Sequence, residues 1–437
     1  MKRLFILTVS VTVLLTSCGN QNAKWEENPE SNKVVHVCGS IEGPSPDVMG
    51  IALSGSDYFH GKDWFRIKVR NGGFAEDVPL NDGQAYELFA FEDRRLGQST
   101  IKYFFADRDT IRLNFVYGPD KKDLRRFVPE NVSGNTLQHH QYLVAIDSVF
   151  KNETLAYNSY YDSVRGSTLS QEYLDLLAAL DDRKLDERTE DSLRIVQQMM
   201  MANGEHLTPE GTKAKEMGDQ LSRLKLDYTW NQLVSSEPTL ANFQILATSL
   251  GTENQLEGDF SRWIRLYQEE YEKRFPDCIL HQKVQSVINS RAIREGVPFI
   301  DFTLPDKDGK DQTFSQLISG KVAVLEFWAT WCGPCIANRR ALKEIYQRYY
   351  DQDFTVVCVA REFKDNREWL AFIDKEGDSW PDLISLGKDH SIGTVDYGLG
   401  NAAGGSFLID KDGTILKINP TEEDIEAAMA KYALRTQ

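Results

Sequence analysis

The sequence predicts a multidomain protein in which an antiparallel β domain is followed by an α-helical region and a C-terminal α/β domain. The chain of 437 residues is longer than one hydrophobic core usually serves. The spacing of its apolar residues changes twice, from a period of two to a period of about 3.6, and then to an alternation of both. These two observations divide the folded part into residues 33–130, 131–294 and 295–437.

The first 32 residues precede these domains and have the composition of a targeting segment. Two basic residues are followed by an apolar run too short to span a bilayer comfortably, and small residues then lead to Cys18. This pattern resembles the lipobox of bacterial lipoproteins. The resemblance implies a signal peptide over residues 1–17, a lipid on the Cys18 thiol and a tether over residues 18–32. A plain secretory signal is the alternative, and both predict an extracytoplasmic protein, on the periplasmic side of a cell-envelope membrane.

The net charge and the cysteine content limit the functions that this chain can have. The net charge of -16 argues against a nucleic-acid partner, because phosphate binding needs clustered Lys and Arg. Of six cysteines, five remain besides Cys18, so at least one thiol is free. Cys358 lies in an apolar run and is the candidate for an inert strand residue. Cys38 and Cys278 can pair only if the fold brings them together.

Residues 33–130 alternate apolar and polar side chains in short runs, with turn residues at 71–73 and 81–83. We expect an antiparallel sandwich or small barrel that serves as a scaffold or a docking surface for a partner. The expected strands are 34–37, 50–53, 64–69, 85–91 and 110–116.

Residues 131–294 have the period and composition of helices. Ser170 is a plausible N-cap for a helix over 171–180, and residues 209–211 mark a break. A methionine run at 199–201 is read as helix packing, since no His or Cys cluster accompanies it.

Strands alternate with helices in residues 295–437, which predicts a βαβ unit with a parallel component. Thr421 and Asp424 form a capping box for the last helix. The expected elements are strands at 322–327 and 354–360, helices at 335–349 and 367–375, a hairpin of 406–409 and 414–418, and a helix at 421–434.

A C-x-x-C pair lies where the first of these strands passes into its helix, in the run E-F-W-A-T-W-C-G-P-C that ends at Cys335. Backbone N–H groups and the helix dipole at this place stabilise a thiolate and lower its pKa. We therefore expect Cys332 to be the exposed nucleophile. Cys335, one turn further and better buried, is placed to resolve a mixed disulfide.

Two other readings of the pair are a zinc site and inert buried thiols. Zinc requires four ligands, and His390 is the only histidine of this domain. Structural cysteines seldom flank Gly-Pro at a helix start. A redox pair is favoured, and we expect neither a metal nor a cofactor.

Residues 324–335 resemble the active site of the thioredoxin superfamily, and the lead-in over 297–304 resembles the TlpA and ResA branch of extracytoplasmic thiol-disulfide oxidoreductases. The match covers about the last third of the chain and implies a thioredoxin-like fold. It also implies that Glu326, at the position of a buried acid, exchanges a proton with Cys335. Burial should raise the pKa of that carboxyl toward working pH.

The chain departs from this family in two places. The family has a cis-proline in the loop that faces the cysteines and docks the substrate, whereas residues 402–405 read A-A-G-G, so the loop is expected to be trans or mobile. Trp331, Gly404 and Gly405 are the expected docking residues. The family's Glu and Pro in the active-site helix are replaced by Asn338 and Arg340, so no kink is expected. Arg339 and Arg340 could favour the thiolate or an acidic partner.

The function predicted is thiol-disulfide exchange with extracytoplasmic proteins through Cys332 and Cys335. Gly-Pro between the cysteines resembles thioredoxin, whose potential of about -270 mV favours a reductase, and a reductase needs a membrane thiol electron donor. A binding lipoprotein with weak turnover and a thiol peroxidase are the alternatives. The Thr three residues before the cysteine in peroxiredoxin-type sites is not matched by Thr330.

Overall fold

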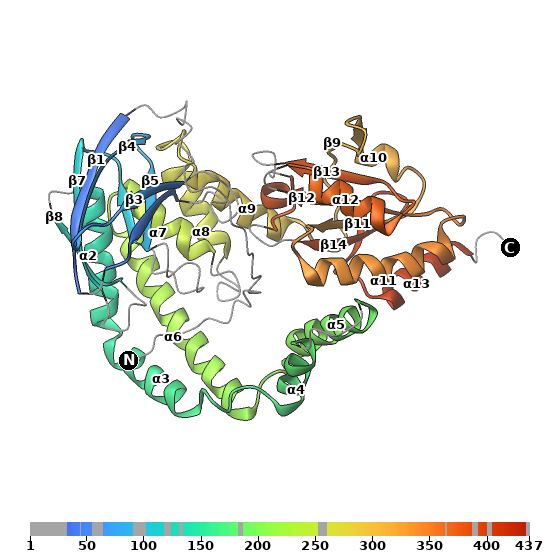
Figure 1. Ribbon diagram of the computed structural model, residues 1–437, viewed down its shortest axis with the longest axis horizontal. Coiled ribbons are helices and arrows are strands. Elements are labelled where there is room, and N and C mark those ends of the chain that lie inside the picture. Colours follow the sequence, from blue (N-terminus) through green and yellow to red (C-terminus); the bar gives the residue numbers. More distant parts are fainter. Residues whose placement is uncertain are drawn as a thin grey trace. The chain divides into compact units, whose positions relative to one another are not determined.

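The computed structural model describes residues 33–43, 45–54, 64–90, 102–117, 124–130, 134–181, 187–251, 260–362, 365–386, 392–399 and 404–433 (Figure 1). The predicted signal peptide and tether, with Cys18, lie outside these residues, and so does His390. Among the helices described, none has the length and apolar character needed to cross a membrane. The chain divides into two compact units, Met1–Ser163 with Ala214–His281 and Val164–Lys213 with Gln282–Gln437.

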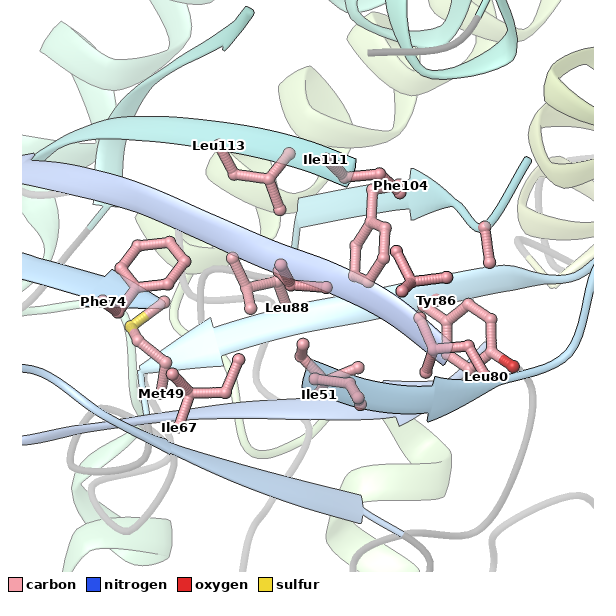
Figure 2. Close-up of a cluster of buried hydrophobic side chains, with 14 of the residues drawn as sticks. Met49, Ile51, Ile67, Phe74, Leu80, Tyr86, Leu88, Phe104, Ile111 and Leu113 are labelled. Carbon is pink, nitrogen blue, oxygen red and sulfur yellow. The ribbon is translucent and has the colours of Figure 1, made fainter. Parts of the chain in front are cut away.

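The first unit contains two four-stranded sheets, with strand orders β4-β1-β7-β8 and β3-β2-β5-β6. Alternate residues of both sheets fill one core. Figure 2 shows side chains of this core, among them Met49, Ile51, Leu88, Phe74 and Leu113. The strands are β1 (Lys33–Glu42), β2 (Val48–Leu53), β3 (Trp64–Lys68), β4 (Gly73–Leu80), β5 (Ala85–Ala90), β6 (Lys102–Phe105), β7 (Thr110–Tyr117) and β8 (Leu124–Glu130).

The strand-rich N-terminal region agrees with the sequence, but its sheets are not wholly antiparallel. β1 pairs with β7 in parallel, whereas the other registered pairs of these sheets are antiparallel. The chain passes through the other sheet between β1 and β7, and such a long connection allows either direction. β4 was not predicted because Pro79 and the adjacent acidic residues Glu76 and Asp77 disrupt its alternation. It lies at a sheet edge, where proline is tolerated.

Helices dominate the middle of the chain, as predicted. Ser170 caps α4, because its Oγ accepts a hydrogen bond from the backbone N–H of Tyr173 at 3.3 Å. Pro209 opens α6, and Thr208 Oγ1 accepts from the N–H of Gly211. The helices are α2 (Gly134–Val149), α3 (Lys151–Val164), α4 (Gln171–Leu180), α5 (Glu187–Asn203), α6 (Pro209–Val234), α7 (Leu240–Leu250), α8 (Phe260–Leu266) with the π-helical turn η2 (Tyr267–Tyr271), and α9 (Leu280–Ala292). α4 and α5 belong to the second unit.

The second unit has a five-stranded sheet of order β13-β12-β11-β14-β15. β11 (Val322–Trp328), β12 (Phe354–Glu362) and β13 (Asp382–Leu386) are parallel, and β14 (Gly405–Ile409) and β15 (Ile415–Ile418) are antiparallel. The parallel component was predicted, and the short β13 was not. α11 (Gly333–Tyr349), α12 (Arg367–Glu376) and α13 (Glu422–Ala433) pack on one face of β11. α10 (Phe314–Leu317) and the π-helical turn η4 (Ile392–Asp396) pack on the other, near the hairpin of β9 (Thr303–Pro305) and β10 (Asp311–Thr313).

Local signals in this unit are confirmed. The N–H of Thr421 donates to Asp424 Oδ2 at 2.9 Å, and the N–H of Asp424 donates to Thr421 Oγ1 at 3.3 Å, which completes the capping box. The β14–β15 turn closes where the N–H of Gly413 donates to the carbonyl of Asp410, with a φ of 88° at Gly413. These signals fix the ends of the elements that surround the C-x-x-C pair.

Candidate active site

Cys332 and Cys335 form a disulfide in the first turn of α11, with their Cα atoms 5.3 Å apart. Cys332 has extended backbone geometry and is the N-cap, and its Sγ accepts a hydrogen bond from the N–H of Cys335 at 3.3 Å. Pro334 lies in the first turn, where its missing N–H costs nothing. Cys335 is 9% exposed and belongs to the core. The outer sulfur therefore lies at the positive end of the helix dipole.

The turn that leads into this helix is fixed by a carboxylate that the sequence did not indicate. Glu362, at the end of β12, is buried and accepts hydrogen bonds from Thr330 N at 2.8 Å and Thr330 Oγ1 at 3.1 Å. Burial raises the pKa of Glu362. Parallel β11 and β12 end at the same sheet edge, so an acid ending one strand meets the turn that follows the other. That strand-end position was the only signal available in the sequence.

Glu326 lies in the middle of β11 and is 2% exposed. Alternation along the strand places its side chain on the same face as Val324 and Trp328, the face that α11 and Cys335 cover. Burial raises the pKa of Glu326 to about 7, although hydrogen bonds to its charged form oppose this rise.

Two donors meet at one oxygen of this carboxyl. Asn338 Nδ2 donates to Glu326 Oε2 at 3.0 Å and to Ser406 Oγ at 3.0 Å, and Ser406 Oγ donates to the same Oε2. Asn338 lies on α11, three residues after Cys335, and Ser406 lies on β14, opposite Glu326. Glu326 is therefore hydrogen-bonded both to α11, which carries the cysteines, and to β14, which follows the predicted docking loop.

Gly404 lies directly against the inner cysteine. A Cβ atom there would be 2.7 Å from Cys335 Sγ and 2.4 Å from the carbonyl oxygen of Phe327, so no side chain fits. Gly405 begins β14 and pairs with Phe327, and Trp331 is half-buried in the turn before Cys332. Residues 402 and 403 lie outside the described residues, within which no peptide bond is cis.

Arg339 and Arg340 both have carboxylate partners within this unit. Arg339 is 1% exposed, bonds to Asp378 and Asp382, and lies 4.5 Å from the centre of the Trp328 ring. Arg340 pairs with Glu376 at 2.8 Å. The expectation that Arg339 favours the thiolate or a partner is wrong, because its position on α11 turns it toward the chain around β13. The same expectation for Arg340 stays a prediction. α11 runs unbroken through these residues, as expected.

The remaining described cysteines are buried and free. Cys358 lies in the buried strand β12, as predicted, and burial raises the pKa of its thiol. Cys38 and Cys278 are not paired, and burial raises the pKa of Cys278 to about 11. Within the described ranges, no group of three or more His, Cys, Asp or Glu side chains could hold a metal ion.

Known proteins resemble the region that carries this site. The Redoxin family model matches residues 294–434. The thiol-disulfide oxidoreductase ResA of Bacillus thuringiensis is 31% identical over 134 residues, which are 30% of this chain and 74% of the relative. ResA of Geobacillus thermodenitrificans is 33% identical over 139 residues, 31% of this chain and 76% of the relative. The thiol:disulfide interchange protein DsbE of Allochromatium vinosum is 28% identical over 31% of this chain and 75% of its own length.

Among solved structures, a thiol-disulfide oxidoreductase from Bacteroides fragilis aligns at 21% identity with a TM-score of 0.28, over 31% of this chain and 99% of that one. The predicted resemblance to the ResA branch is confirmed by the curated relatives, since the match extends over about three quarters of each ResA at more than 30% identity. The chain belongs to the family of thiol-disulfide oxidoreductases that includes ResA.

Proposed function

We propose that this enzyme reduces disulfides of extracytoplasmic proteins while anchored to a bacterial cell-envelope membrane by a lipid on Cys18. The observation that carries the proposal is the Cys332–Cys335 disulfide at the start of α11, with the buried Glu326 joined to the same helix through Asn338. Oxidation of the reduced pair to its disulfide would supply the two electrons that one protein disulfide takes up.

Cys332 is the proposed nucleophile, since its sulfur caps the helix and is the less buried of the two. In the reduced enzyme its thiolate attacks one sulfur of the substrate disulfide. A mixed disulfide forms, the substrate's S–S bond breaks, and the departing sulfur takes up a proton. Cys335 then attacks Cys332 Sγ, which releases the substrate as a dithiol and restores the Cys332–Cys335 disulfide.

Glu326 is the proposed acceptor of the proton that Cys335 loses in this second step. A carboxyl with a pKa of about 7 is partly ionised near neutral pH, so it can accept a proton and later return it. The alternation of β11 places it on the face that Cys335 covers, and the Asn338 bond ties it to the helix that carries this cysteine. Transfer could be direct or through a water.

Trp331, Gly404 and Gly405 are the proposed docking residues for the substrate chain. The contact between Gly404 and Cys335 Sγ supports this role, because it places the backbone of this loop directly beside the sulfurs. The oxidised enzyme must then regain two electrons and two protons. A membrane thiol carrier is the proposed donor.

Trapping experiments test the proposal in a soluble form that lacks Cys18. Cys335→Ser should accumulate extracytoplasmic proteins disulfide-linked to Cys332, and Cys332→Ser should not. Cys358→Ser is the matched control, because it removes a buried thiol from the same unit, and its trapping should equal that of the unmodified chain. A Cys332–Cys335 pair that neither glutathione nor dithiothreitol can cycle between dithiol and disulfide would sink the proposal.

The anchor is tested separately. A labelled fatty acid fed to cells should appear on the full chain and be lost in Cys18→Ser, which should also leave the membrane fraction. Equal labelling of both chains would refute lipidation at Cys18 without bearing on the redox reaction.

A further inference from the structure

A helix from far upstream in the chain contacts the redox turn. α5 packs on α11 within the second unit. A Cβ atom at Gly333 would lie 3.2 Å from both Cζ and Nε of Arg194 and 3.6 Å from its Nη2, and these are the atoms closest to that position. The guanidinium of Arg194 therefore occupies the space that a side chain between the two cysteines would fill.

The local structure holds α5 and its arginine in place. Leu169 and Leu207 form a β-bridge that closes the segment holding α4 and α5, and Tyr173 of α4 packs edge-on against His206. Glu190, one helical turn before Arg194, accepts from Nε at 2.9 Å and from Nη2 at 2.5 Å. The arginine side chain is only 20% exposed, so its charge is partly shielded from water.

Reduction changes the charge at this place. The disulfide is neutral, whereas the reduced pair carries a thiolate at Cys332 when it reacts. The other titratable groups tied to this turn and its strand include three acids, Glu190 on α5, Glu362 at the end of β12 and Glu326 on β11. The cation Arg339 on α11 also lies against this strand, over the Trp328 ring, and it is paired with Asp378 and Asp382. Acids disfavour a neighbouring thiolate, and a guanidinium against Gly333 opposes them.

We infer that Arg194 is a positioning residue for the redox reaction, and that its guanidinium stabilises the Cys332 thiolate from outside the thioredoxin-like domain. The inference rests on the proposed function, because it concerns the same nucleophile. It assigns α5 a part in the chemistry: the segment upstream of the redox domain supplies the cation that the C-x-x-C motif lacks. It also gives a reason for glycine at position 333, since a side chain there would crowd the guanidinium.

The test measures the pH at which Cys332 reaches half its maximal rate of alkylation by iodoacetamide, in a Cys335→Ser background, with the modified peptide identified by mass spectrometry. Arg194→Gln should raise this pH by about one unit, which slows alkylation at neutral pH by up to about tenfold. Arg194→Lys should restore most of the effect. Added salt should shrink the difference between wild type and Arg194→Gln.

Arg348→Gln is the matched control, because it removes the same charge from the opposite end of α11, where Arg348 pairs with Glu422 and Glu426. Its profile should match wild type. If thermal unfolding shows that Arg194→Gln is unstable, Gly333→Leu fills the space of the same guanidinium while its charge is kept, and it should raise the pH as well.

An unchanged profile in Arg194→Gln or, if that variant is unstable, in Gly333→Leu overturns the inference, and so does a lysine variant that behaves like glutamine. The proposed function fails on a different result, a Cys332–Cys335 disulfide in the full chain that dithiothreitol cannot reduce. The two failures are therefore distinguishable.

Discussion

Replacing Ser406 by alanine should raise the pKa of Glu326 by about one unit. The hydroxyl is one of two donors to Glu326 Oε2, and the other, Asn338, remains in the variant. A hydrogen bond to a charged group contributes about 1.5–3 kcal/mol, and one pKa unit corresponds to about 1.4 kcal/mol. Since Asn338 can turn further toward the carboxylate, the lower end of that range applies.

The direction in which stability changes with pH follows from the pKa of Glu326 in the folded protein and in the unfolded chain. Burial raises the pKa of Glu326 from 4.5 to about 7, so between these values the folded protein holds a proton that the unfolded chain has lost. Stability therefore falls as pH rises through this window. Without Ser406 the carboxylate is less well solvated by the protein, and the fall should continue to higher pH.

The assay is the reduction potential of the Cys332–Cys335 pair against glutathione, measured as a function of pH. If Glu326 exchanges protons with Cys335, the slope of this plot changes where the acid titrates, and Glu326→Gln should remove that change. Ser406→Ala should move it up by about one pH unit. Ser286→Ala is the matched control, because it removes another buried hydroxyl of the same unit, one that donates to the Thr394 carbonyl. A slope change that stays in place in Ser406→Ala would refute the reasoning.

Two other substitutions test the packing around the site. Gly404→Ala places a Cβ against Cys335 Sγ and a β11 carbonyl, so it should destabilise the fold by about 1–3 kcal/mol and slow release of the trapped substrate, as read by thermal unfolding and single-turnover exchange. If Gly404→Ala were as stable as wild type, the close contact between residue 404 and Cys335 Sγ would be contradicted. Arg339→Met removes the cation that Asp378 and Asp382 share, although Asp378 keeps Lys343 at 2.9 Å, and it should cost about 3 kcal/mol in urea unfolding. Arg348→Gln, which breaks only exposed ion pairs, should cost at most about 1 kcal/mol. Similar losses of stability in Arg339→Met and Arg348→Gln would refute the claim that burial makes the Arg339 pairs important.

Local signals accounted for most of what the sequence could predict. Gly-Pro shortly after a largely apolar strand located the disulfide at a helix start, and the Thr421–Asp424 pair located the last helix, because both signals act within one turn. The burial of Glu326 was implied by the family resemblance. Its partner Ser406 was not, because β14 lies next to β11 only after the sheet has formed.

The partners of charged residues were the least predictable feature. Arg339 is four residues from Cys335 in sequence, yet its guanidinium lies among Trp328, Asp378 and Asp382. Arg194 is far from the motif in sequence and lies against Gly333. Distance along the sequence was therefore misleading for both arginines: Arg339 is near the motif in sequence but turned away from it, and Arg194 is far in sequence but in contact with it. A helix turns successive side chains by about 100°, and tertiary packing decides which neighbours they meet.

The identity of residue 338 explains how Glu326 can be fully buried and still titrate near neutral pH. The related enzymes were expected to have Glu at this position of the helix, and a second carboxyl beside Glu326 would raise the pKa of the pair by mutual repulsion. Asn338 is neutral and donates to Glu326 Oε2, so it opposes the desolvation that burial imposes. The same amide also donates to Ser406, two residues after the glycine that lies against Cys335. A substrate chain that shifts this loop would therefore disturb the donors of the acid at the moment when Cys335 has to lose its proton.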